Sequence, residues 1–153
     1  MNIDAFKKII SEFHGELQSI PEEITSVKLT PDTWSLKELL GHLVDSASNN
    51  HQRFVRLQFT PELVFPGYDQ KTWNETERYN EFNWYDLIQL WAGYNKLLLH
   101  IISTLSADSL EHIWVYGERR LTLGWIVNDY YRHVQHHFDQ FKKRNEEIQM
   151  LKP

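Results

Sequence analysis

The stretch YYRHVQHHFDQF, residues 130–141, lies within a long segment whose apolar side chains repeat with the period of an α-helix. At about 100° per residue, these side chains fall within about 80° of Tyr130. The apolar stripe comprises Leu123, Ile126, Val127, Val134, Phe138 and Phe141. Thr122 suits the N-cap of this helix, which we expect to run to about Ile148. A single apolar stripe on a helix of this length predicts packing within a helical bundle.

The same helical wheel separates the three histidines of the stretch. His137 lies inside the apolar stripe and His133 on its edge, whereas His136 falls on the polar face, where we expect it to be solvated. The i to i+4 spacing brings the Cβ atoms of His133 and His137 to roughly 5–6 Å, close enough for both imidazoles to bind one metal ion. Eight histidines in 153 residues give about 0.4 such pairs by chance. The pair alone is therefore a weak indicator.

Three further helices and a hairpin are predicted from periodicity and capping residues. The helices span about Ile3–Leu17, residues 36–59 behind a capping box of Ser35 and Glu38, and about Trp84–Thr104 behind Asn83 as N-cap. The segment HIWVYGERRLT, residues 112–122, alternates around Gly117-Glu118, a turn signal typical of a β-hairpin. We therefore predict an all-α, up-down four-helix bundle with a small β-hairpin before the last helix. We expect one domain over residues 1–153.

Composition excludes several classes of protein. The chain has no cysteine, which removes disulfides, thiolate ligands and cysteine nucleophiles. Its first residues lack the apolar region of a secretory signal, so we expect a cytoplasmic protein. The net charge is −5 and the basic residues form no stripe, which argues against nucleic acid as a partner. No apolar run approaches the roughly 18 residues of a membrane span, so we expect no membrane association.

A third metal ligand would have to come from a facing helix. The segment GHLVDSASNNHQRF, residues 41–54, supplies His42 beside Ser46, Asn49 and Arg53, at offsets of four, seven and eleven residues. This spacing predicts a polar seam that borders the apolar stripe of the second helix, and such a seam can line a pocket. Periodicity fits a solvated flank of the helix equally well.

The order of motifs along the chain resembles that of the DinB/YfiT-like superfamily. The motifs are TWSLKELLGHLVDSASNNHQRF (33–54), FPGYDQKTW (65–73), LTLGW (121–125) and HVQHHFDQ (133–140). The resemblance implies a four-helix bundle with three metal ligands, one histidine on the second helix and an H-x-x-x-H pair on the fourth. In this sequence the implied ligands are His42, His133 and His137.

Within the superfamily the chain looks most like the YfiT-like branch of metal-dependent hydrolases. The residues that carry this likeness are Asp45, Ser46, Asn49, Arg53 and Phe54 after His42, and Tyr68, Asp69 and Trp73 in the loop. Gln140 departs from the branch, which has a further histidine at that position. We expect substrate contacts from Arg53, Asn49, Tyr68 and Trp73, with Gln140 and Asp45 supporting the ligands. No residue is assigned as the catalytic base.

Three histidine ligands leave positions open at a divalent ion, as in catalytic zinc sites. The implied function is hydrolysis of an amide or ester of a small molecule by metal-bound water. One alternative is a metal-dependent S-transferase that uses a low-molecular-weight thiol; another is a non-catalytic module that binds metal or a small ligand. Imidazole suits several metals, and zinc or nickel is expected, nickel from the resemblance alone. A twofold homodimer is a further expectation for such a bundle.

Overall fold

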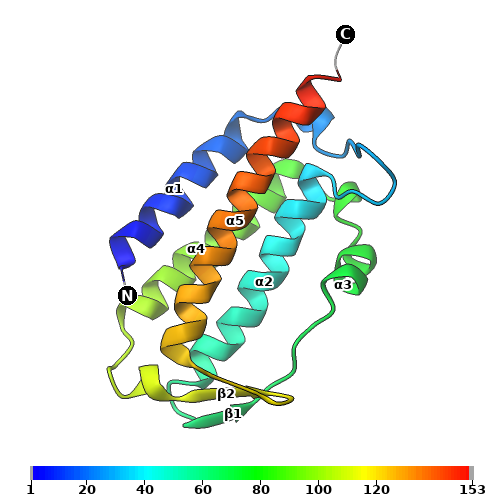
Figure 1. Ribbon diagram of the computed structural model, residues 1–153. Coiled ribbons are helices and arrows are strands. Elements are labelled where there is room, and N and C mark those ends of the chain that lie inside the picture. Colours follow the sequence, from blue (N-terminus) through cyan, green and yellow to red (C-terminus); the bar gives the residue numbers. More distant parts are fainter. Residues whose placement is uncertain (1, 152–153) are drawn as a thin grey trace.

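The computed structural model describes residues 2–151 and is dominated by four long helices (Figure 1). They are α1 (Ile3–Ser19), α2 (Leu36–Arg56), α4 (Trp84–Ser103) and α5 (Leu123–Gln149). The predicted four-helix bundle is therefore confirmed. The predicted domain of residues 1–153 extends beyond the described residues at both ends.

Local capping signals fix where the helices begin. The side chains of Ser35, Asn83 and Thr122 each accept a hydrogen bond from the backbone N–H three residues later, as predicted. These bonds satisfy N–H groups that have no partner within the helix. The sequence predicted the end of α2 less well: the helix stops at Arg56, three residues before the predicted Phe59, and residues 57–59 form turns.

The helices do not alternate in direction along the chain. α1 and α5 run the same way, because Phe6 stacks on Tyr131 and Phe13 stacks on Phe138, with ring centroids 3.9 and 4.5 Å apart. α2 and α4 both run the opposite way, towards the end of the bundle that carries the small sheet (Figure 1). Both α1 and α2 pack against α4 and α5. The bundle thus has the order up, down, down, up, which requires residues 57–83 to return the chain along its side.

The returning segment contains secondary structure that periodicity did not predict. It carries strand β1 (Glu62–Val64) and helix α3 (Gln70–Glu77). The predicted hairpin is confirmed as β2 (Ile113–Tyr116) and β3 (Arg119–Thr122), with Gly117 at a φ of 57° in the turn. β1 pairs in parallel with β2 and so makes a three-stranded sheet at one end of the bundle. Three short 3-10 helices complete the chain, η1 (Glu22–Ile24), η2 (Tyr79–Glu81) and η3 (Ser109–Glu111).

Aromatic side chains fill the centre of the bundle. Phe13 of α1 packs against Trp91 of α4 and against Phe138 and Phe141 of α5. Phe13, Trp91 and Phe141 are fully buried. Burial of large apolar side chains is the main favourable term in folding. The helices are amphipathic, and over residues 2–151 none is long and apolar enough to cross a membrane.

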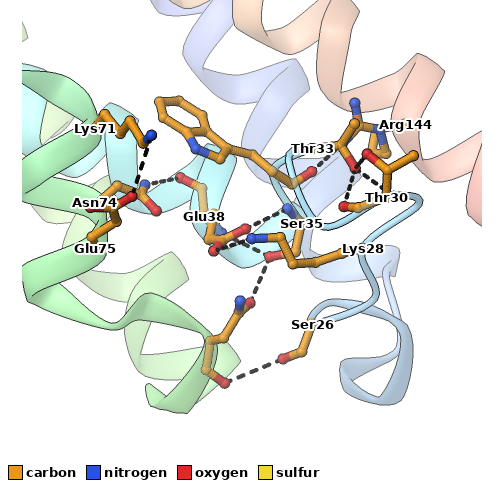
Figure 2. Close-up of polar contacts among 12 residues, drawn as sticks. Ser26, Lys28, Thr30, Thr33, Ser35, Glu38, Lys71, Asn74, Glu75 and Arg144 are labelled. Atoms are coloured by element: carbon orange, nitrogen blue, oxygen red, sulfur yellow. Dashed lines mark hydrogen bonds and ion pairs between the residues drawn. The ribbon is translucent and has the colours of Figure 1, made fainter.

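Polar contacts fix the first turn of α2 (Figure 2). Ser35 and Glu38 form the predicted capping box, and the Ser35 hydroxyl also donates to the side-chain oxygen of Asn80 at 2.6 Å. Lys28 pairs with Glu38 at 3.0 Å, and the amide of Asn74 in α3 donates to the Glu38 carbonyl at 2.8 Å. This network holds α3 and η2 against the N-terminal end of α2, whose N-cap Ser35 lies seven residues before His42.

A second tie joins the segment before α2 to the last helix. Arg144 of α5 donates a hydrogen bond to the backbone carbonyl of Trp34 (Figure 2). The indole of Trp34 in turn lies beside the imidazole of His42, with ring centroids 5.3 Å apart. The helix that carries His42 and the helix that carries the other two candidate ligands are therefore held together near the site.

Candidate metal centre

Three histidine side chains from two helices converge on one point. His42 of α2 lies with its Nε2 atom 3.1 Å from Nε2 of His133 in α5, and Nε2 of His137 lies 3.0 Å from the same atom. These three residues form the group of potential metal ligands found within residues 2–151, with ligand atoms within 4.8 Å of one another. Two nitrogens that are each about 2.0–2.1 Å from one ion lie roughly 3 Å apart. The nitrogen separations therefore fit a shared metal ion.

Contacts to the other ring nitrogens fix how the imidazoles are presented. Nδ1 of His137 donates to Oε1 of Gln140 at 2.8 Å, because an amide oxygen can only accept. The Nε2 atom of His137 therefore carries its lone pair towards the centre. The Ser46 hydroxyl lies 3.5 Å from Nδ1 of His133, and Nδ1 of His42 is buried without a hydrogen-bond partner. Hydrogen bonds of this kind at the outer nitrogen commonly orient metal-binding histidines.

The electrostatic surroundings keep the three imidazoles neutral. Burial, reinforced by the two neighbouring imidazoles, lowers the pKa of His42 to about 3. Burial and the adjacent His137 lower the pKa of His133 to about 4, and burial also lowers the pKa of His137. A neutral imidazole is the form that binds a metal ion, whereas the protonated form cannot. At neutral pH the cluster has three lone pairs available and no positive charge of its own.

A cavity of about 280 Å³ opens beside the histidines and extends towards the sheet end of the bundle. His42 and His133 line one part of it, and Arg53, Tyr68 and Trp114 line another. The remaining lining residues are Ser46, Asn50, Gln70, Arg119, Leu121, Trp125, Ile126, Asp129 and Tyr130. A cavity with a few convergent polar groups is the usual form of a small-molecule site.

The structure divides the residues expected to contact substrate. Arg53 and Tyr68 line the histidine cavity, but Asn49 and Trp73 line a different one on the other flank of α2. Asn49 donates to the backbone carbonyl of Asp45 at 2.9 Å instead of facing the histidines. Trp73 packs behind Tyr68, with ring centroids 4.9 Å apart. Trp73, which we expected to contact the substrate, therefore contacts Tyr68 and does not itself line the histidine cavity.

Of the two residues expected to support the ligands, Gln140 contacts a histidine and Asp45 contacts a tyrosine. The Tyr79 hydroxyl donates to the Asp45 carboxylate at 2.5 Å, and Asp45 is only 3% exposed. Burial raises the pKa of Asp45 to about 6, and burial together with the Asp45 carboxylate raises the pKa of Tyr79 above its usual range. Asp45 therefore belongs to a buried pair between α2 and η2. His136 is exposed, as predicted.

Several residues at the site had no signal in the helical pattern. Trp34 precedes α2, and Trp114 lies on strand β2, whose position against the bundle depends on pairing with the distant β1. Trp114 is held in place by donating from Nε1 to the carbonyl of Phe65 at 2.8 Å. Asn50 lies on the same flank of α2 as Ser46 and accepts from Arg53 at 3.2 Å. Its offset of eight residues from His42 could have indicated it.

The bundle and its three-histidine centre define a class of helical proteins in which side chains of facing helices build a site in the core. Comparison with known families is consistent with that class. The chain belongs to the DinB superfamily, whose family profile matches residues 5–141. No curated protein sequence matches the chain.

Two of the solved structures that share the fold illustrate the likeness. One is YfiT from Bacillus subtilis, described as "a probable metal-dependent hydrolase with an unusual four-helix bundle topology"; it aligns with a TM-score of 0.83 and 16% identity, over 95% of this chain and 87% of that chain. The other is a mycothiol-dependent maleylpyruvate isomerase, with a TM-score of 0.74 and 13% identity, over 89% of this chain and 57% of that chain. At these identities the likeness concerns the fold.

Proposed function

We propose that the protein is a metal-dependent enzyme that acts on a small molecule in the cavity beside His42, His133 and His137, with hydrolysis of an amide or ester as the reaction. The observation that carries this proposal is the convergence of three neutral Nε2 atoms at separations of 3.0 and 3.1 Å. The adjoining cavity gives a substrate access to the same point. A divalent ion held there supplies Lewis-acid activation of water, a thiol or a carbonyl oxygen.

The residues of the chain have separable tasks in this proposal. Gln140 fixes the His137 tautomer, and Ser46 positions His133 through its outer nitrogen. Asp129 is the carboxylate that lines the cavity, one helical turn before His133, and it is held by Arg132 at 2.8 Å. We assign Asp129 the acceptance of a proton during hydrolysis, since general bases must lie within reach of the reacting group.

The second candidate function is metal-dependent transfer to a low-molecular-weight thiol. The observation that favours it is the scarcity of bases: Asp129 is the one carboxylate among the described residues lining the cavity, and it already has a cationic partner. A thiol has an ordinary pKa of about 8.5 and becomes a thiolate readily next to a cation, so this reaction needs no protein base. The fold shared with a mycothiol-dependent isomerase is compatible with it.

Imidazole ligands alone do not select one metal. We propose zinc or nickel: three neutral imidazole nitrogens suit zinc among several ions, and nickel is suggested by the resemblance to the DinB superfamily alone. The choice is testable by elemental analysis of protein purified without a histidine tag. One equivalent of either metal in the wild-type chain supports the proposal.

The decisive experiment compares His137→Ala with His136→Ala. His136 is the exposed neighbour of His137, so it controls for loss of an imidazole elsewhere on α5. We expect His137→Ala to lose bound metal and all metal-dependent turnover on a panel of esters and amides, and His136→Ala to keep both. Equal metal content in the two variants would contradict the assignment of the centre.

The panel is run with and without a low-molecular-weight thiol to separate the two reactions. Turnover without thiol that falls in Asp129→Asn supports hydrolysis, whereas turnover that needs thiol and survives in Asp129→Asn supports transfer. Stoichiometric metal binding with no turnover on either panel would leave the third expectation, a non-catalytic metal-binding module.

A further inference from the structure

Arg53 is a buried cation with no acidic partner among residues 2–151. The side chain extends from α2 into the histidine cavity, and the residue is only 7% exposed. Its Nη1 donates to Oδ1 of Asn50 at 3.2 Å, and its guanidinium carbon lies 4.0 Å from the ring centroid of Trp114. Nε is buried and has no hydrogen-bond partner.

Three other arginines of the chain have acidic partners. The side chain of Arg144 is also mostly buried, but it pairs with Glu147 at 3.2 Å and binds the Trp34 carbonyl. Arg120 and Arg132 pair with Glu62 and Asp129 at 2.6 and 2.8 Å. A guanidinium stays charged in proteins, and burying a charge without a counter-charge is costly. Burial lowers the pKa of Arg53, in keeping with a cation removed from water.

The unused edge of the guanidinium is the one that would receive an oxyanion. Asn50 occupies Nη1 and Trp114 covers one face, while no protein group accepts from Nε or Nη2 among the described residues. Nε and Nη2 together form one side of the guanidinium fork, and this side matches the two oxygens of a carboxylate.

The position of Arg53 on α2 relates this edge to the histidines. Arg53 lies eleven residues after His42, about three helical turns and roughly 16 Å along the axis, on the same face. Side chains of a helix point towards its N-terminus, so the long side chain of Arg53 extends back towards His42. Both residues line the same cavity.

We propose that the cavity takes a small molecule with a carboxylate at one end, that Arg53 receives this carboxylate through Nε and Nη2, and that Trp114 holds the guanidinium in place. The reacting group of the same molecule then lies at the histidines, at the other end of the cavity. The substrate class is thus an extended carboxylic acid whose ester, amide or thiol-reactive group is remote from the carboxylate. This inference names the substrate class for the proposed function and rests on it for the reaction.

The test uses phenylacetate and phenylacetamide, which have nearly equal size and differ in charge, titrated calorimetrically into full-length protein with and without zinc. We expect phenylacetate to bind at least about 10-fold more tightly, the usual range for a charge-assisted contact. This preference should persist without metal, and Arg53→Met should weaken the binding of phenylacetate far more than that of phenylacetamide, so that the preference is lost. Arg53→Lys, which keeps the charge but lacks the fork, should restore only part of it.

Three outcomes would overturn the proposal. One is a preference for phenylacetate that exists only with zinc, since the anion would then bind the metal. Another is inorganic sulfate binding as tightly as phenylacetate, which would indicate a general anion site. The third is a preference for phenylacetate that persists unchanged in a folded Arg53→Met variant, since Arg53 would then not receive the carboxylate.

Two features keep the test decisive. If Arg53→Met does not fold, the Nε–H resonance of Arg53 in ¹⁵N-edited spectra of the wild-type protein replaces it: phenylacetate should move this resonance and phenylacetamide should not. Failure of the metal centre is also distinguishable. A chain that binds no metal but prefers phenylacetate would refute the proposed function and leave the anion site standing.

Discussion

Two polar regions of α2 differ in how completely their groups are paired. At the start of the helix, Ser35 and Glu38 have partners in η2, in α3 and in the preceding loop. On the cavity flank, Nδ1 of His42 and Nε of Arg53 are buried without partners. Buried polar groups are normally paired, and those that are not require an explanation. The paired groups of the first region stabilise the fold, whereas we propose that the unpaired groups of the second region bind a metal ion and a ligand.

The largest expected effect concerns the unpaired region. A ligand at about 1,000 times its dissociation constant stabilises the native state by about 4 kcal/mol. We expect zinc to raise the melting temperature of the wild-type chain accordingly, and to have no effect on His133→Ala. Differential scanning calorimetry with and without EDTA measures this. If zinc still raised the melting temperature of His133→Ala, the metal would bind elsewhere. The unpaired groups of α2 would then have no role in metal binding that distinguishes them from the paired ones.

Asp45 shares a feature of each region: one carboxylate oxygen accepts from Tyr79, and the other is buried without a partner. Its pKa is about 6 in the folded chain and about 3.9 in an unfolded one. Between these pH values the folded chain binds a proton on Asp45 more tightly than the unfolded chain does. The stability that this proton contributes to the folded state is therefore lost as pH rises from about 4 to 6. The integrated loss is on the order of 3 kcal/mol, at 1.36 kcal/mol per pKa unit.

Asp45→Asn removes this titration and keeps an oxygen that can accept from Tyr79. We expect the variant to gain stability relative to the wild type as pH rises from 4 to 7, by up to about 3 kcal/mol. Urea unfolding of the two metal-free proteins at both pH values measures the difference. The histidines titrate in the opposite sense but equally in both chains, so they cancel. A difference independent of pH would mean that Asp45 ionises normally.

Gln140 supports the centre through one hydrogen bond to His137. Loss of such a contact typically weakens metal affinity by about 10–100-fold, so we expect Gln140→Ala to retain the fold and to bind zinc more weakly by that factor. Competition with a fluorescent chelator gives the affinity. Gln135→Ala is the matched control, because Gln135 bonds to Asp139 on the outer face of the same helix. Equal affinities in the two variants would remove Gln140 from the site.

The smallest effect is expected in the paired region. Ser35→Ala removes the N-cap of α2 and should lower the free energy of unfolding by about 1 kcal/mol, measured in urea, with little change in zinc affinity. Ser48→Ala is a suitable control, since the Ser48 hydroxyl donates to the Asp45 carbonyl within the same helix. A large loss of metal affinity in Ser35→Ala would show that the two regions are coupled more closely than their spacing indicates.

The sequence predicted what depends on neighbours along the chain. Helix periodicity, the caps at Ser35, Asn83 and Thr122, and the pairing of His133 with His137 are all local, and each requires only residues within a few turns. Periodicity alone left two positions open for His42, one lining a pocket and one on a solvated flank of the helix. The packing of α2 against α5 decides between them, and no pattern of neighbouring residues predicts that packing.

Three other features escaped prediction for physical reasons. β1 is short and pairs with β2 about fifty residues later, so no local pattern marks it. Trp114 reaches Arg53 only because of that pairing. Asn49 shares a face of the wheel with Arg53, but its amide turns to a carbonyl of its own helix. A helical wheel gives the directions of the Cβ atoms and does not predict the side-chain rotamers.

His42 and His133, whose Nε2 atoms lie 3.1 Å apart, are 91 residues apart along the chain. Closing so large a loop costs more entropy than any contact within a helix, and the cost grows with loop length. An ion cannot therefore nucleate this protein as zinc nucleates a small finger domain, because the three nitrogens meet only after the aromatic core has assembled. We therefore expect a metal ion to bind a bundle that has already folded, and synthesis of the chain in metal-poor conditions should yield a folded apoprotein that binds the ion afterwards.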